Sequence, residues 1–134
     1  MRSRLVLEND ERSYGAEDAL FLNKALGVPV VFDYLHHTAL AKELPNMNLL
    51  RRICGSWSIS DGCPKFHYSA QKLGSRAGSH ADMLDVEDFL RFVQVLPSSD
   101  VDILLEVKAK DLALLALRSE LWGRPHSLKG WNII

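Results

Sequence analysis

Short apolar segments alternate with helical patterns along most of this chain. Four segments of four or five mostly apolar residues have the length and composition of buried β-strands. We expect these strands at residues 4–7, 29–32, 65–68 and 101–105. Strands that alternate with helices pair in parallel, with right-handed crossovers between them. The pattern therefore predicts an α/β fold made of four consecutive βα units.

The helices are predicted from apolar periodicity and from residues that favour helix ends. We expect helices over residues 16–26, 42–57, 86–96 and 110–121. Gly27 is a typical C-cap of the first, while Asp85 and Pro97 are a typical N-cap and stop signal for the third. The second is the least regular, because Pro45 and Gly55 interrupt its pattern.

The length and composition indicate one globular domain. The chain has 134 residues, of which 47% are hydrophobic and 25% charged, with a formal net charge of -1. A net charge near zero gives no general attraction to nucleic acid, so any phosphate contact must be local or made through metal ions. Cys54 and Cys63 fit no zinc motif, and we expect them to be reduced in a cytoplasmic protein. No apolar stretch is long enough to cross a membrane, so we expect no membrane partner.

Each predicted strand ends in, or carries near its end, a residue that can bind a metal ion. The six candidate ligands are Glu8, Asp33, His36, His67, His80 and Glu106. The carboxyl ends of parallel strands face one rim of a sheet, where active sites of such folds lie. Carboxylates and imidazoles at one rim therefore predict a divalent metal centre.

Each candidate ligand also has a simpler interpretation. Glu8 can cap the next helix or pair with an arginine, and Asp33 can form a turn. His67 can be a core histidine, and Glu106 can pair with Lys108. Recurrence at one rim favours the metal centre over these separate interpretations.

Five segments of the chain resemble the UV damage endonuclease family, in the family's order. They are residues 4–14, 31–37, 64–69, 79–82 and 102–111. The resemblance spans roughly residues 4–118 and implies the C-terminal half of a TIM (β/α)8 barrel over residues 1–122. The tail, residues 123–134, matches the family poorly.

The resemblance implies a metal-dependent DNA repair endonuclease. Such enzymes nick the backbone immediately 5′ of UV photoproducts in double-stranded DNA, and abasic sites are a further candidate substrate. The six ligands carry over by position, with manganese expected and zinc, iron and magnesium also compatible. Glu8, Lys65 and Glu106 would be catalytic, and Lys65 matches a family lysine that can be carboxylated. Such a modification would remove the repulsion between an ammonium group and a metal ion.

Three basic residues are candidates for contacts with DNA phosphates. Lys72 and Arg76 lie in the polar stretch 69–79, which we expect to be a long loop, and Lys108 follows the last strand. A solvated surface is the alternative interpretation of all three.

The resemblance covers only half of the family's barrel. We expect a fragment, a truncated product or one part of a split enzyme, and its partner would be the missing N-terminal half-barrel or a second copy of the chain. Two other functions stay open: a metal-dependent sugar isomerase-like barrel enzyme, and a catalytically inactive module.

Overall fold

The computed structural model describes residues 4–97 and 100–124. The strands are β1 (Leu7–Glu8), β2 (Val30–Asp33), β3 (Lys65–Tyr68) and β4 (Asp102–Leu105). The α-helices are α1 (Ala16–Leu26), α2 (Tyr34–Ala41), α3 (Met47–Gly55), α4 (Val86–Val95) and α5 (Asp111–Trp122), and a 3-10 turn, η2, spans Ile59–Asp61. In this part of the chain no helix has the length and apolar character needed to cross a membrane.

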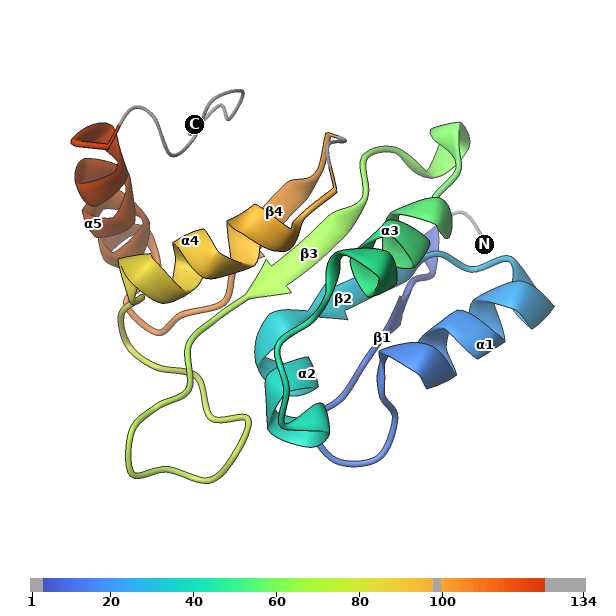
Figure 1. The fold of residues 1–134 in the computed structure, drawn as a ribbon, viewed down its shortest axis with the longest axis horizontal. Coiled ribbons are helices and arrows are strands. Elements are labelled where there is room, and N and C mark those ends of the chain that lie inside the picture. Colours follow the sequence, from blue (N-terminus) through green and yellow to red (C-terminus); the bar gives the residue numbers. More distant parts are fainter. Residues whose placement is uncertain (1–3, 98–99, 125–134) are drawn as a thin grey trace.

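The four strands form one parallel sheet in the order β1-β2-β3-β4 (Figure 1). Asp33 at the end of β2 pairs in register with His67 of β3, and His67 pairs with Leu104 of β4. The structure thus confirms the predicted α/β fold with parallel strands. Sequential strands are direct neighbours, so their carboxyl ends follow one another along a single rim.

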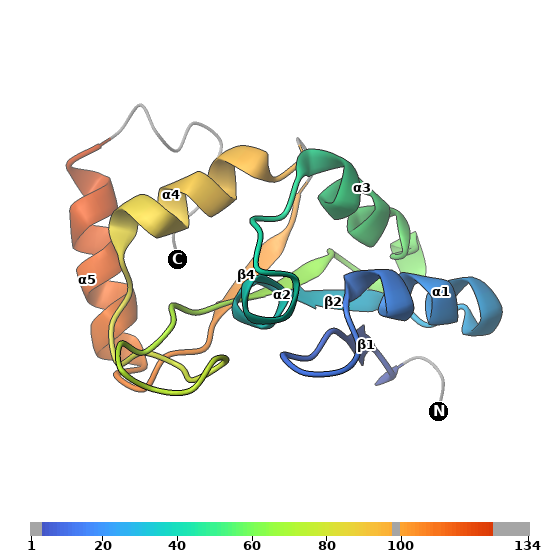
Figure 2. The ribbon, with the colours of Figure 1, turned by 60° about the horizontal axis from the view of Figure 1, so that its bottom comes forward.

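The two faces of the sheet differ in their cover. Helices α1, α3 and α4 lie over one face, and no helix of the described chain covers the other face in the same way (Figure 2). Phe32, Phe66 and Tyr68 point to the covered face, where they form the core with Phe92 of α4. Because side chains alternate along a strand, residues between these positions point to the open face.

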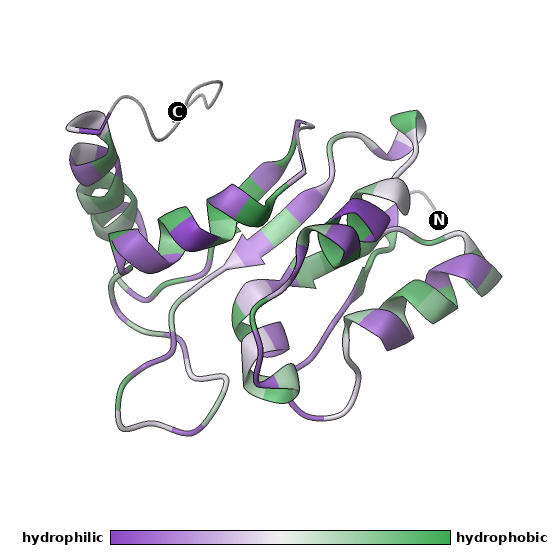
Figure 3. Cartoon of the chain, viewed as in Figure 1, coloured by the Kyte–Doolittle hydropathy of each residue, from purple (hydrophilic) through white to green (hydrophobic). Residues whose placement is uncertain are grey.

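Hydropathy follows this alternation. Polar positions interrupt the apolar ones along β3 and β4 (Figure 3). Along β3, Lys65 and His67 are only partly buried, whereas the residues that alternate with them, Phe66 and Tyr68, are fully buried. Leu104 on the open face of β4 is 57% exposed. The open face therefore presents the polar side chains of the sheet together with an exposed leucine.

The first half of the chain differs from the sequence prediction in two places. The first strand is Leu7–Glu8 rather than residues 4–7, because pairing with β2 includes only Leu7 and Glu8, while Leu5 and Val6 are exposed. The helix expected over residues 42–57 is shorter, because only α3 (Met47–Gly55) forms there, and an additional helix that was not predicted, α2, precedes it at Tyr34–Ala41. Lys42 adopts a left-handed conformation with φ of 57° and ends α2, and the Asn46 side chain then caps α3.

One carboxylate joins α4 to the start of α2 and the end of β3. The hydroxyls of Tyr34 and Tyr68 donate hydrogen bonds of 3.0 and 2.7 Å to the two oxygens of Asp88. Burial raises the pKa of both phenols, and the neighbouring Asp88 carboxylate raises each further. The two rings also lie 5.0 Å apart and contact Phe92 of the same helix. Asp88 therefore fixes α4 over the end of the sheet that carries the site.

Replacing Asp88 with alanine should destabilise the fold. The substitution leaves two largely buried phenol hydroxyls without their charged acceptor, which costs about 3 kcal/mol in the free energy of unfolding. Urea denaturation measures this change. Glu87→Ala is the matched control on the same helix, since Glu87 pairs with Arg124 at the exposed surface and should contribute less than about 1 kcal/mol. Equal losses in the two variants would contradict the linking role of Asp88.

Candidate metal centre

The six predicted ligands lie together at the carboxyl-end rim of the sheet. One group of ligand atoms within 4.8 Å of one another comes from Glu8, Asp33 and His36, and a second comes from Asp33, His67 and Glu106. His80 joins them through its ring, which lies 6.1 Å from the ring of His36 in an edge-on arrangement. Residues up to 98 positions apart in the sequence thus meet at one place, although their role as ligands stays a prediction.

Asp33 lies at the centre of the cluster and belongs to both groups. Its side chain is fully buried, and its Oδ1 atom caps α2 by accepting a hydrogen bond of 2.7 Å from the backbone N–H of His36. Its Oδ2 atom is buried and has no hydrogen-bond partner. Burial raises the pKa of Asp33, and the nearby carboxylates of Glu8 and Glu106 raise it further. A buried oxygen among like charges is a site that a cation would stabilise.

His67 lies between two other carboxylates. Its Nδ1 atom is 2.9 Å from Glu8 Oε1 and 3.3 Å from Glu106 Oε1. The hydrogen bond to Glu8 raises the pKa of His67 more than burial lowers it, and the nearby carboxylates add to the increase. The carboxylates therefore favour the protonated form of His67, whose charge would offset part of the negative charge that converges at the rim.

Backbone carbonyls orient the other two histidines. The Nδ1 atom of His36 lies 3.1 Å from the carbonyl oxygen of Asn9, and Nδ1 of His80 lies 2.7 Å from that of Glu106. A carbonyl oxygen only accepts, so each Nδ1 carries a proton, and Nε2 is the ring atom that can bind a metal ion. This is the arrangement in which histidines usually bind metal ions in proteins.

Asn9 holds the ends of β1 and β2 together, and the sequence patterns did not single it out. The side chain is buried; its Nδ2 donates to the carbonyl of Asp33, and its Oδ1 accepts from the N–H of Asp33, both at 2.9 Å. An amide that directly follows a strand-ending acid was the available signal. Asn9 thus places Asp33 through its side chain and His36 through its carbonyl.

Lys65 has partners of its own outside the six candidate ligands. It begins β3 and forms an ion pair with Asp102, its register partner on β4. Its Nζ also lies 5.8 Å from the centre of the Trp57 ring. The Lys65 ammonium is thus paired with Asp102, and its catalytic role stays a prediction.

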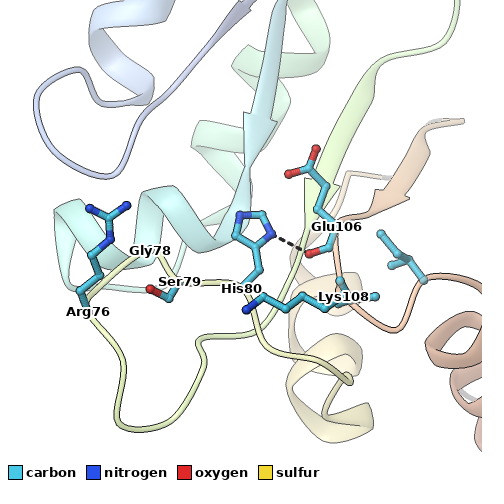
Figure 4. Close-up of a pocket in the computed structure, with 8 residues that line it drawn as sticks. Arg76, Gly78, Ser79, His80, Glu106 and Lys108 are labelled. Carbon is cyan, nitrogen blue, oxygen red and sulfur yellow. Dashed lines mark hydrogen bonds between the residues drawn. The ribbon is translucent and has the colours of Figure 1, made fainter.

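The three basic residues predicted to contact DNA differ in their surroundings. Lys72 lies 3.7 Å from Asp82 in an ion pair. Arg76 and Lys108 instead line a pocket next to the metal centre, together with His80 and Glu106 (Figure 4). The alternative pairing of Glu106 with Lys108 is absent from the described part of the chain, where Glu106 faces His67.

Comparisons with known proteins point to one family. The family model described as UV-endonuclease UvdE matches residues 1–127. A protein of Clostridium perfringens named UV DNA damage endonuclease is 33% identical over 116 residues, which cover 85% of this chain and 28% of that protein. A protein of the same name from Bacillus cereus strain Q1 is 36% identical over 123 residues, covering 90% of this chain and 39% of the relative.

A solved structure agrees with these matches. The crystal structure of SacUVDE is similar with a TM-score of 0.77 and 34% identity, over 93% of this chain and 41% of that chain. The chain therefore spans less than half the length of the relatives it matches. The family model nevertheless covers nearly all of its residues, and the chain belongs to the UV-endonuclease UvdE family.

Proposed function

We propose that the chain supplies the metal-binding rim of a DNA repair endonuclease, which nicks the backbone immediately 5′ of UV photoproducts in duplex DNA and also accepts abasic sites. The observation that carries the proposal is Asp33, whose buried Oδ2 accepts no hydrogen bond and lies amid converging carboxylates and imidazoles, 3.7 Å from His36 Nδ1. The chain's membership of the UvdE family and its relatives named UV DNA damage endonuclease support DNA as the substrate. Work on DNA would also place the chain inside the cell, which suits the lack of a disulfide at Cys54 and Cys63 among the described residues.

We further propose that the four βα units form the C-terminal half of a TIM barrel. The parallel order of the strands, the helices on one face and the similarity to SacUVDE support this proposal. The open face, with Lys65, His67 and Leu104, would then line the barrel interior. The proposed half-barrel comprises residues 1–122, and most of the tail at residues 123–134 lies outside the described residues.

The residues at the rim fit a cluster of divalent ions. Three carboxylates and three imidazoles provide both oxygen and nitrogen donors, a combination that suits manganese, zinc or iron and is compatible with magnesium. We propose manganese, as the family resemblance implies. Asp33 would contact ions through Oδ2, since its Oδ1 already caps α2. His36 and His80 would bind through Nε2, because their Nδ1 atoms face carbonyl oxygens.

The chain's own groups would prepare a phosphodiester for hydrolysis. When bound, divalent ions supply Lewis acidity toward a scissile phosphate. Glu8 and Glu106 would carry the negative charge that retains such ions, and both lie next to Nδ1 of His67. Asn9 keeps Asp33 and His36 at fixed positions, so little reorganisation is needed when substrate arrives.

Glu8→Gln and Glu106→Gln should each lower the metal content sharply. Each change removes one negative charge from the rim and keeps the size of the side chain. Elemental mass spectrometry on purified protein measures the metal, and circular dichroism should show unchanged helical signal. Glu17→Gln is the control, because Glu17 pairs with Arg52 at the exposed surface of α1 and α3. Unchanged metal stoichiometry in both rim variants would refute the site.

Nicking of UV-irradiated supercoiled plasmid should require the divalent ion. Treatment with EDTA should abolish nicking, and added Mn²⁺ should restore it, while unirradiated plasmid stays supercoiled. Asp33→Asn should reduce the rate at least about 100-fold, since it removes the charge shared by both ligand groups. Equal nicking with and without EDTA would rule out a metal-dependent mechanism.

Turnover of a free sugar without nicking would favour the isomerase alternative.

Asn9→Ala should weaken metal binding although Asn9 offers no ligand in either group. The substitution frees the backbone of Asp33, and loss of such supporting contacts typically lowers metal affinity about 10- to 100-fold. Isothermal titration with Mn²⁺ measures the affinity. Asn46→Ala provides the comparison: it removes an asparagine that caps α3 through the N–H of Leu49, not a candidate ligand, and should lower stability while leaving affinity intact. Wild-type affinity in the Asn9 variant would show that Asn9 acts only in folding.

A further inference from the structure

We propose that the pocket lined by Arg76, Ser79 and Lys108 binds a second phosphodiester of the DNA strand, one that neighbours the phosphate at the metal centre. The proposal rests on the proposed function and adds a separate anion site to it. The pocket has a volume of about 500 Å³, within the range of ligand sites, and it is open to solvent. It therefore has room for a phosphate together with its sugar.

The pocket and the metal centre share two residues. His80 and Glu106 line the pocket, and both are also candidate metal ligands. Figure 4 shows the Glu106 carboxylate pointing away from Lys108, and its Oε1 lies 3.3 Å from His67 on the metal side. Only the backbone carbonyl of Glu106 turns toward His80. A strand with one phosphate at the ions would thus pass directly over the pocket.

The pocket carries two cations without a direct ionic partner, although Arg76 is near enough to Glu11 to help lower the pKa of that carboxyl. Neither Arg76 nor Lys108 forms an ion pair within residues 4–97 and 100–124, unlike Arg52, Lys65 and Lys72, which all have acidic partners. In Figure 4 the Lys108 side chain extends past His80 toward Ser79. Two cations and a hydroxyl donor are the groups with which proteins bind phosphate oxygens.

Local hydrogen bonds hold the Arg76 side of the pocket in place. The Gln71 side chain donates to the carbonyls of Lys72 and Arg76 at 3.0 and 2.9 Å, and it accepts from the N–H of Gly78 at 2.9 Å. Gly78 has a φ of 81°, and a Cβ there would meet Glu11 Cγ at 2.5 Å. The predicted long loop is therefore a closed turn that rests against the β1–α1 connection.

A salt titration of DNA binding tests the proposal. The probe is a fluorescein-labelled, UV-irradiated duplex oligonucleotide, with binding followed by anisotropy in EDTA so that no cleavage occurs. Arg76→Gln and Lys108→Met should each weaken binding roughly tenfold at low salt. Each should also reduce the slope of log affinity against log salt by about 0.9, the value for one lost phosphate contact. Arg51→Gln, on exposed α3, is the control for loss of one charge and should keep the wild-type slope.

The outcomes separate this proposal from the proposed function. A reduced slope in both pocket variants, with unchanged metal content, supports the phosphate site even if the protein fails to nick DNA. Wild-type slopes in both variants, an equal effect of Arg51→Gln, or no binding by the wild-type protein would each overturn it. Metal content that falls with the pocket variants would also overturn it, because the basic residues would then act through the metal centre.

Discussion

The structure of the rim is governed by electrostatic repulsion among carboxylates brought together by the fold. Asp33 is buried with Oδ2 unpaired, while Glu8 and Glu106 lie near enough to raise its pKa. Such an arrangement is unfavourable without positive charge, and His67 can supply only one unit of it. The fold holds Asp33 in place through two hydrogen bonds between its backbone and the Asn9 side chain, while Glu8 and Glu106 contact His67. These contacts keep mutually repelling carboxylates in the arrangement that cation binding would require.

Because side chains alternate along β3, one face of the sheet packs the core and the other carries the candidate site. Phe66 and Tyr68 pack under α4, and Tyr68 is joined to that helix through Asp88. His67, between them, points to the opposite face and meets Glu8. Stability and chemistry thus depend on neighbouring residues of the same short strand. A substitution on the covered face can move the candidate ligands only by moving the strand. Core variants should therefore lower stability, whereas variants of the open face should change the site, and experiments can tell the two apart.

The fold class and the set of clustered side chains could be predicted from the sequence, because both follow from periodicity. Apolar segments alternating with helical patterns predict parallel strands, and strand-end residues then meet at one rim. Helix α2 could not be predicted in the same way. It is only eight residues long, has weak amphipathic character and begins directly at Asp33, where a turn was an equally good interpretation. Lys65 shows another limit: alternation assigns it to the face of His67, but its pairing with Asp102 depends on the register with β4.

The polar loop between β3 and α4 shows how a segment without periodicity can still be ordered. Composition predicts a long loop over residues 69–79, since serine, glycine and charged side chains offer no apolar face. In the structure, Gln71 satisfies the backbone of its own loop at three points, and the loop then reaches Glu106 through His80. Such side-chain to backbone bonds depend on the exact path of the chain and leave no repeating signal in the sequence. The order they create matters because the same loop supplies both a candidate ligand, His80, and a candidate phosphate contact, Arg76. A cation on a closed turn loses less conformational entropy on binding an anion than one on a flexible segment, which favours this loop as the wall of a preformed site.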